Sequence, residues 1–184
     1  HKLYRSRLTR GVWRDKTRPI LLNNWEATYF DFNEEKILEI AKKAKEVGVE
    51  LFVLDDGWFG ARNDDYRGLG DWYCNLNKLP NGISGLSEKV EALGLKFGLW
   101  MDVESLGKYC PQFKDNPEWR AKNTLGEQTD KFIDFTNEEA AAWCESELER
   151  VIKEYKLDLL RVDYNTSYRD YFNMRDTGTG VKEC

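Results

Sequence analysis

Short apolar runs that stop abruptly at polar side chains recur along this chain of 184 residues. In the run Leu51–Trp58, four apolar residues lead directly into two aspartates, a glycine and a tryptophan. Leu95–Glu104 and Leu157–Asn165 end in acids or an amide, and Pro19–Trp25 ends in two asparagines and a tryptophan. These runs predict four short buried strands. Any one of them can be a strand that merely ends in a polar turn, but four in series favour a common site at their carboxyl ends.

Helical patterns occupy the gaps between these runs. Asn33 is placed to cap a helix whose apolar positions lie between residues 37 and 47. A shorter helix is expected to end at Gly94, and Thr136 with Glu139 forms the capping-box pattern at the start of a third. Strands that alternate with helices of this length predict a parallel sheet with right-handed crossovers.

This alternation, with polar residues at the carboxyl ends of strands, is typical of the α/β class and of the (β/α)8 TIM-barrel type. A complete barrel needs about 250 residues, whereas the chain offers four strands. We therefore expect about the first four βα units and a fragment of a larger enzyme. Residues 1–18, with seven Lys and Arg, are predicted to be a linker. Residues 19–184 are predicted to be the N-terminal half of the catalytic domain. A complete small α/β domain is the alternative.

Paired carboxylates beside aromatic side chains at strand ends are suited to binding a sugar. Asp55 and Asp56 can accept hydrogen bonds from hydroxyl groups. Trp25, Trp58 and Trp100 also fall at strand ends, where an indole can cover the apolar face of a sugar ring. The sequence therefore predicts a carbohydrate site at the carboxyl ends of the strands.

Charge and composition exclude several other classes of function. The net charge of −5 and the pI near 5.1 disfavour nucleic acid as a partner, and no apolar segment is long enough for a membrane span. His1 is the single histidine, which disfavours a histidine-based zinc site or a Ser-His-Asp triad. A hard cation held by Asp55, Asp56 and Asp64 is the alternative to the sugar site. Four cysteines without metal-ligand spacing predict a cytoplasmic, reducing environment, with Cys144 in the core.

Six segments, in order and at sensible spacing, match the motifs of one enzyme family. They are Arg18–Asn33, Leu54–Gly60, Leu69–Trp72 followed by Lys78–Gly82, Gly94–Trp100, Asn116–Trp119 and Arg161–Asn165. On these motifs the chain resembles the family 36 glycoside hydrolases, the bacterial-type α-galactosidases, over about residues 3 to 170. The resemblance implies hydrolysis of terminal α-galactosyl residues of oligosaccharides, with no cofactor and no metal. We also expect the full-length protein to be a homo-oligomer.

The resemblance also implies roles for individual residues. Asp163 matches the nucleophile of a retaining mechanism, which forms a covalent galactosyl-enzyme. Arg161 stands where the family usually has a lysine that contacts the sugar, and its charge is expected to favour ionised Asp163. Asp55 and Asp56 match the pair that binds the galactose O4 and O6 hydroxyls. The other predicted sugar contacts are Trp25, Trp58, Trp100 and Asn165.

Departures from the family pattern leave the fine specificity open. Met101–Ser105 lacks the proline that commonly separates two glutamates there, and residues 108–128 lack the arginine of a Gly-Arg loop. The family's acid/base aspartate would lie beyond Cys184, so the chain alone is predicted to be inactive. An α-N-acetylgalactosaminidase, a galactosyl transglycosidase and a non-catalytic carbohydrate-binding half-barrel remain as alternatives.

Overall fold

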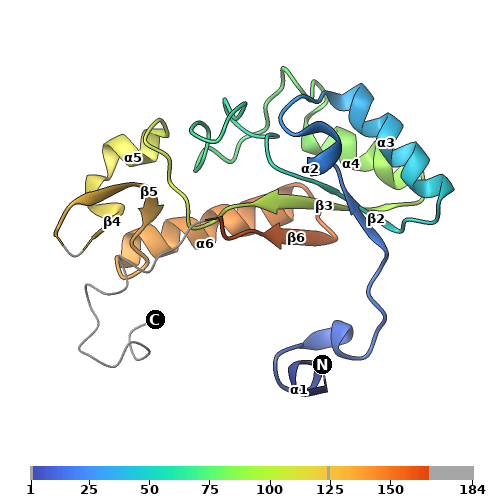
Figure 1. The fold of residues 1–184 in the computed structure, drawn as a ribbon, viewed down its shortest axis with the longest axis horizontal. Coiled ribbons are helices and arrows are strands. Elements are labelled where there is room, and N and C mark those ends of the chain that lie inside the picture. Colours follow the sequence, from blue (N-terminus) through green and yellow to red (C-terminus); the bar gives the residue numbers. More distant parts are fainter. Residues whose placement is uncertain (1, 124, 166–184) are drawn as a thin grey trace.

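A parallel β-sheet organises the chain (Figure 1). The computed structural model describes residues 2–123 and 125–165. The strands are β1 (Leu21–Asn23), β2 (Leu51–Leu54), β3 (Lys96–Met101), β4 (Arg120–Lys122), β5 (Gln128–Ile133) and β6 (Leu159–Val162). The α-helices are α1 (Lys2–Arg7), α2 (Trp25–Thr28), α3 (Glu34–Glu46), α4 (Gly82–Ala92), α5 (Pro111–Asp115) and α6 (Glu138–Glu154), and 3-10 turns span Gly11–Arg14 and Pro117–Trp119.

The order of strands in the sheet is β1-β2-β3-β6, and every neighbouring pair is parallel. This confirms the prediction of an α/β fold with a parallel sheet, and the four apolar runs of the sequence are its four strands. Gly98 lies at the centre, where its backbone pairs with Val53 on one side and Leu159 on the other. Because all strands are parallel, their carboxyl ends lie at one edge and bring the polar residues that follow them together.

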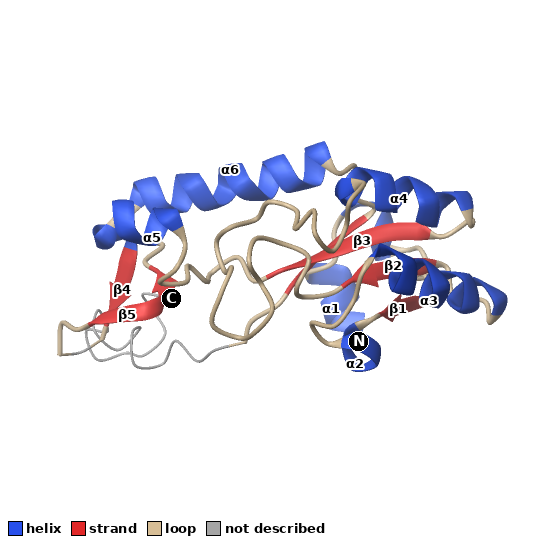
Figure 2. Ribbon diagram, turned by 90° about the horizontal axis from the view of Figure 1, so that it is seen from above, coloured by secondary structure: helices blue, strands red, loops and turns tan. Residues whose placement is uncertain are grey.

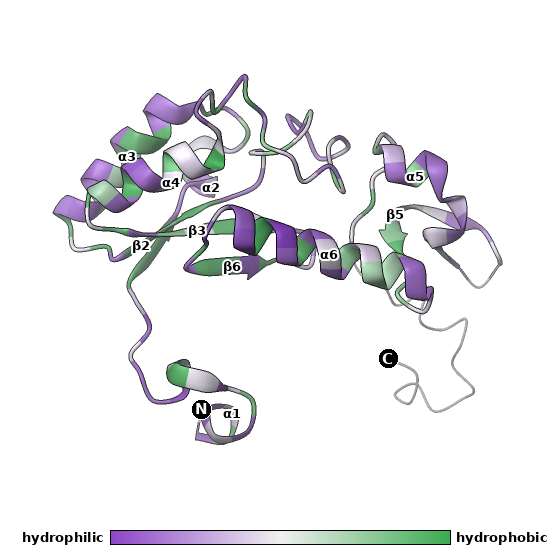
Figure 3. Ribbon diagram, turned by 180° about the vertical axis from the view of Figure 1, so that it is seen from behind, coloured by the Kyte–Doolittle hydropathy of each residue, from purple (hydrophilic) through white to green (hydrophobic). Residues whose placement is uncertain are grey.

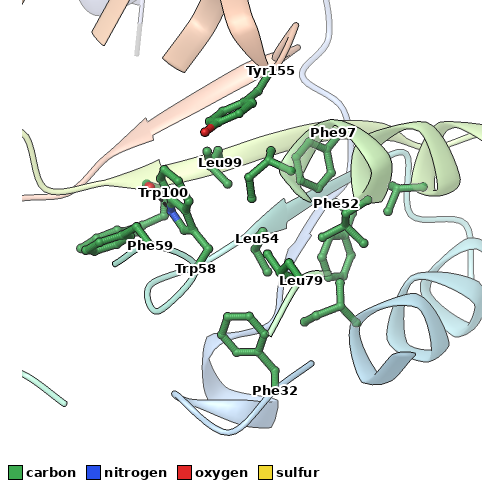
Figure 4. Close-up of a cluster of buried hydrophobic side chains, with 14 of the residues drawn as sticks. Phe32, Phe52, Leu54, Trp58, Phe59, Leu79, Phe97, Leu99, Trp100 and Tyr155 are labelled. Atoms are coloured by element: carbon green, nitrogen blue, oxygen red, sulfur yellow. Dashed lines mark hydrogen bonds between the residues drawn. The ribbon is translucent and has the colours of Figure 1, made fainter. Parts of the chain in front are cut away.

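A single apolar cluster fills the space between the sheet and its helices (Figure 4). Figure 3 shows the apolar residues concentrated in β2, β3 and β6, whereas the helices carry both kinds of residue. Helix α6 lies on one side of the sheet and extends beyond β3 toward β4 (Figure 2). Its Val151, and Tyr155 directly after the helix, join the cluster. Its Cys144 is buried, as predicted from the helical spacing.

The helix ends follow the sequence signals with one exception. The Asn33 side chain accepts a hydrogen bond from the N–H of Lys36, 2.9 Å away, and caps α3 as predicted. The predicted cap of α6 was wrong, because Asn137 rather than Thr136 caps this helix. The side-chain Oδ1 of Asn137 accepts from the backbone N–H of the second and third helical residues, whereas the Thr136 hydroxyl donates to Asp134.

Strands β4 and β5 form a separate antiparallel pair that the sequence did not predict. Neither β4, with three residues, nor α5, with five, is long enough to produce a recognisable period. Backbone hydrogen bonds join this pair to the segment after β3: Leu106 N–H donates to Lys131 and Ile133 N–H donates to Glu104. Among residues 2–123 and 125–165, none of the helices combines the length and apolar character needed to cross a membrane.

Candidate active site

The carboxyl ends of β2, β3 and β6 meet at a cavity of about 300 Å³. It is lined by Trp25, Asp55, Asp56, Arg62, Asp65, Trp100, Asp102, Lys131, Arg161, Asp163 and Asn165. Another cavity, of about 410 Å³, lies at the opposite ends of the strands beside Trp13 and Arg18. Of the two, the cavity at the carboxyl ends holds the cluster of acids that the sequence predicted there.

Asp55 follows β2 and is held from both outer strands of the sheet. The Asn23 amide of β1 donates to Asp55 Oδ2 over 2.9 Å, and Arg161 Nη1 of β6 donates to the same oxygen over 2.8 Å. The other oxygen accepts the backbone N–H of Asp56. Burial raises the pKa of Asp55, although the Asp56 N–H and the Arg161 charge oppose the rise. The carboxylate is thus fixed in one orientation before any ligand arrives.

Asp56 makes a buried, two-armed ion pair with Arg62. Arg62 Nε lies 2.9 Å from Asp56 Oδ1 and Arg62 Nη2 lies 2.7 Å from Oδ2. The two side chains are only 5% and 7% exposed. Burial raises the pKa of Asp56, and the hydrogen bonds and charge of Arg62 act against this. The sequence analysis did not identify Arg62, since an arginine six residues after an acid forms no recognisable motif.

Asp163 follows β6 and accepts two side-chain hydrogen bonds. Trp100 Nε1 donates to Asp163 Oδ2 over 3.0 Å, and the Asn165 amide donates to the same oxygen over 3.3 Å. Burial alone would raise the pKa of Asp163, but the Trp100 bond, the Arg161 charge and the Asn165 bond hold it below its ordinary value. Arg161 contributes less directly than the sequence suggested, because it lies 2.8 Å from Asp55 and 3.9 Å from Asp163.

The three strand-end tryptophans have different positions. Trp25 is half-buried at the start of α2, and it lines the cavity together with Trp100. Trp58 does not, because its side chain is fully buried and its Nε1 donates to the Trp100 carbonyl over 2.9 Å. Gly57, with φ of 104°, turns the chain after β2 so that Trp58 packs edge-on against Phe59 in the core. The predicted sugar-stacking role of Trp58 is therefore corrected to a core role.

The cavity also contains side chains that the sequence did not assign to a site. Arg62, Asp65, Asp102 and Lys131 line it. Asp102 had been identified only as an acid at a strand end, and no pattern marked Lys131. Asp64, the third residue of the alternative cation site, is not among the lining residues. Its Oδ1 accepts the backbone N–H groups of Tyr66 and Arg67. In the described part of the chain, no group of three or more His, Cys, Asp or Glu side chains is arranged to hold a metal ion.

Asp102 and Glu104 bring two further carboxyl groups to the end of β3. Each residue is only 2% exposed. Burial, together with the nearby Asp102 charge, raises the pKa of Glu104 to about 7. Burial likewise raises the pKa of Asp102, which lines the cavity while Glu104 does not. At neutral pH this pair therefore carries less negative charge than two exposed carboxylates would.

Comparison with known proteins shows that the chain is similar to part of several alpha-galactosidases. Residues 1–182 match the family described as Melibiase. Alpha-galactosidase AgaA of Geobacillus stearothermophilus is 60% identical over 119 residues, 65% of this chain and 16% of that protein. Alpha-galactosidase Mel36A of Lactobacillus acidophilus is 37% identical over 176 residues, 94% of this chain and 24% of that protein. The chain thus spans about a quarter or less of the length of these curated relatives.

Solved structures agree in fold. The crystal structure of AgaA, a GH36 alpha-galactosidase, superimposes with a TM-score of 0.85 at 45% identity, over 90% of this chain and 24% of that one. Variants of AgaA were solved in complex with raffinose and with stachyose. The alpha-galactosidase TtGalA of Thermus thermophilus, in complex with p-nitrophenyl α-D-galactopyranoside, gives a TM-score of 0.71 at 26% identity, over 88% of this chain and 33% of that one. The described fold therefore matches part of the barrel-type catalytic domain of these enzymes.

Proposed function

The chain belongs to the melibiase family, the family 36 glycoside hydrolases, and on this premise we propose that it carries the nucleophile and much of the sugar site of a retaining α-galactosidase. One observation carries the proposal: the Asp163 carboxylate and the Asp55–Asp56 pair line the same cavity of about 300 Å³. Such a volume lies at the lower end of the range for ligand pockets. It suits one sugar ring rather than a long oligosaccharide.

Asp163 is the proposed nucleophile. Its lowered pKa keeps the carboxylate ionised near neutral pH. One of its oxygens attacks the anomeric carbon, the bond to the leaving oxygen breaks, and a covalent galactosyl-enzyme forms. Trp100 and Asn165 both donate to Oδ2. These two bonds orient the carboxylate, and Oδ1, which accepts the Tyr164 backbone N–H over 3.2 Å, is the oxygen proposed to attack the sugar.

Asp55 and Asp56 are the proposed ligands of the galactose O4 and O6 hydroxyls. Arg161 and Arg62 fix the two carboxylates, so their remaining lone pairs point in defined directions. In galactose the O4 hydroxyl is axial, whereas in glucose it is equatorial. A buried acceptor that the wrong epimer leaves without a donor costs about 1–3 kcal/mol. The pair can therefore select galactose over glucose.

The second catalytic carboxyl group, which protonates the leaving oxygen and later activates water, is proposed to lie outside these 184 residues. In this view residues 1–18 lead into the barrel and residues 19–184 form its N-terminal half. We expect the purified chain alone to be inactive, because protonation of the leaving group would have to come from bulk water. Hydrolysis of an aryl α-galactoside by this chain would contradict that expectation.

The decisive experiment compares the full-length gene product with its Asp163→Gly variant. Three substrates are used: p-nitrophenyl α-galactoside, the α-glucoside and the α-N-acetylgalactosaminide. We expect activity on the galactoside that falls by on the order of 10⁴-fold in the variant. Added azide should restore release of p-nitrophenolate, since azide can occupy the vacated space and form β-galactosyl azide.

A matched control comes from the other end of the same strand. Asp158 precedes β6 and accepts the backbone N–H of Phe97 over 3.1 Å. Asp158→Asn keeps that acceptor and should retain activity. A preference for the α-N-acetylgalactosaminide would replace galactose in the proposal, and oligosaccharide products at high substrate concentration would indicate a transglycosidase. Activity on none of the substrates, or an unimpaired Asp163→Gly variant, would refute the proposed function.

A further inference from the structure

We propose that Lys131 and Asp102 bind the C2–C3 side of the galactosyl ring and determine which substituents the site accepts there. The inference rests on the proposed function and adds to it two residues that determine specificity. Lys131 lies on β5, far in sequence from the strands that carry the acids, and Asp102 directly follows β3. Both line the cavity that holds Asp163.

The backbone of β5 holds Lys131 at the cavity wall. Leu106 N–H donates to the Lys131 carbonyl over 2.6 Å, and Ile133 N–H donates to the Glu104 carbonyl over 3.0 Å. The residue between them, Phe132, is buried and pairs with Ser105. Side chains alternate along a strand, so Lys131 lies on the face opposite Phe132, and on that face it lines the cavity. The backbone hydrogen bonds between β5 and the segment after β3 thus hold Lys131 beside the cavity.

Lys131 differs from the other cations of the cavity in its partners. Arg62 is bound to Asp56 and Arg161 to Asp55, each at 2.8 Å or less. Among the side chains that the structure describes, none forms a hydrogen bond or an ion pair with the Lys131 ammonium, although its charge acts on Asp102. An ammonium carries three donors, and these remain for a ligand.

Asp102 offers the complementary acceptor. The residue is only 2% exposed, and within residues 2–123 and 125–165 its Oδ1 has no hydrogen-bond partner. A buried carboxylate oxygen without a donor is costly, so it marks a position where a ligand group is expected. A sugar hydroxyl both donates and accepts. One hydroxyl can therefore donate to Asp102 and accept from Lys131.

The shape of the pyranose ring decides which hydroxyls these are. In the proposed complex, C1 faces Asp163 after β6, and O4 and O6 face the pair after β2. Strand β3 lies between β2 and β6 in the sheet, so Asp102 stands between these two anchor points. The hydroxyls between C1 and C4 on the side away from O6 are O2 and O3. Asp102 and Lys131 are therefore assigned to that side.

The experiment removes the side chain and the substrate hydroxyl separately and together. In the full-length gene product, Lys131→Met removes the ammonium and keeps the aliphatic stem. Wild type and variant are compared on p-nitrophenyl α-galactoside and on its 2-deoxy and 3-deoxy analogues. We expect K131M to lower kcat/KM on the parent substrate roughly 10- to 100-fold. On the analogue that lacks the contacted hydroxyl, it should lower kcat/KM by less than about threefold. Asp102→Asn should show the same dependence on that hydroxyl.

Lys122→Met is the matched control, because Lys122 lies on the neighbouring strand β4, is exposed and does not line the cavity. It should leave all rates unchanged. A merely structural role for Lys131 would lower kcat/KM by the same factor on every substrate, and that result, or no loss at all, would overturn the inference while leaving the proposed function intact. If the wild type hydrolyses no α-galactoside, the proposed function fails and this inference fails with it.

Discussion

The cavity is built from two regions of unequal character. The first, here called the parallel-sheet unit, comprises β1, β2, β3 and β6 with α3 and α4. The second, the β4–β5 unit, comprises α5, β4 and β5 with their own smaller apolar cluster. Figure 1 shows them at opposite ends of the molecule, and α6 spans both. Ala140 of α6 packs in the smaller cluster and Val151 in the larger one.

The two regions contribute different chemistry to the site. The parallel-sheet unit supplies the acids Asp55, Asp56 and Asp163, each already held by an arginine or a tryptophan. The β4–β5 unit supplies Lys131, whose ammonium has no such partner within the described residues. The fixed groups suit the proposed reaction, which needs one geometry. The less constrained cation suits recognition of substituents that differ between substrates.

The largest loss of stability that we expect from a single substitution follows replacement of Arg62, which lies in the parallel-sheet unit. Arg62→Met leaves the buried Asp56 carboxylate without its cation. Removal of one partner of a buried ion pair costs about 3–5 kcal/mol. The free energy of unfolding, measured by urea titration of the full-length gene product, should fall by that amount. The double variant R62M/D56N should recover much of the loss, because the buried charge is gone.

Arg67→Met provides the control for that measurement. Arg67 pairs with Asp64 at 3.5 Å, but the two side chains are 63% and 39% exposed. An exposed pair contributes about 0–1 kcal/mol. If the two arginine variants lost the same free energy of unfolding, the buried pair of Asp56 and Arg62 would contribute no more to stability than an exposed ion pair.

The parallel-sheet unit could be predicted because each of its signals is local in sequence. The apolar runs, the Asn33 cap and the acids at strand ends are all visible within a few residues. Parallel pairing then brings Asp55 and Asp163 into one cavity without further information. The error on Trp58 arose because the turn at Gly57 decides whether the next side chain faces the cavity or the core.

The β4–β5 unit could not be predicted, since its contacts join residues that are distant in sequence. Lys131 reaches the cavity only because β5 docks on the segment after β3. No periodicity marks either strand of the pair, and the ion pair between Asp56 and Arg62 is likewise invisible in a single sequence. Asp55, Asp56 and Asp163 were therefore predicted as cavity residues, whereas the cations Arg62 and Lys131 were not.

A second prediction concerns the junction of the two regions, where Glu104 lies. Its folded-state pKa of about 7 exceeds the ordinary 4.5. Between these values the unfolded chain releases a proton that the folded state retains, so stability falls as pH rises through this window. Glu104→Gln should remove the share of this decline that Glu104 contributes, and so raise stability at pH 7, relative to pH 5, by about 1–3 kcal/mol.

Urea midpoints at several pH values between 5 and 8 measure this effect. Glu118→Gln is the control, because Glu118 is an exposed acid near β4. It should leave the slope of stability against pH as it is in the wild type. An unchanged slope in the Glu104→Gln variant would show that Glu104 is not the group that titrates.

A third, smaller effect compares a tryptophan of each region. Trp100→Phe removes the donor to Asp163 Oδ2, so the pKa of Asp163 should rise. The acid limb of the kcat/KM profile should then move to higher pH, with kcat about 10-fold lower. Trp119→Phe replaces the buried indole that directly precedes β4, whose Nε1 has no hydrogen-bond partner within the described residues. That variant should leave the acid limb in place, and a shift of equal size in both would refute the assignment.

The smallest expected effect tests the helix that joins the two regions. Asn137 caps α6 by accepting the N–H groups of Glu139 and Ala140 over 3.0 and 3.1 Å. Asn137→Ala should lower the free energy of unfolding by about 1 kcal/mol, whereas Thr136→Ala, at the position that the sequence favoured, should lower it by clearly less. Because the cap lies at the β4–β5 end of α6, hydrogen exchange should increase most in the first turn of the helix. Amides near Val151, which pack against the parallel-sheet unit, should remain protected. Equal deprotection along the whole helix would mean that α6 unfolds as one body and that the two regions are stabilised together.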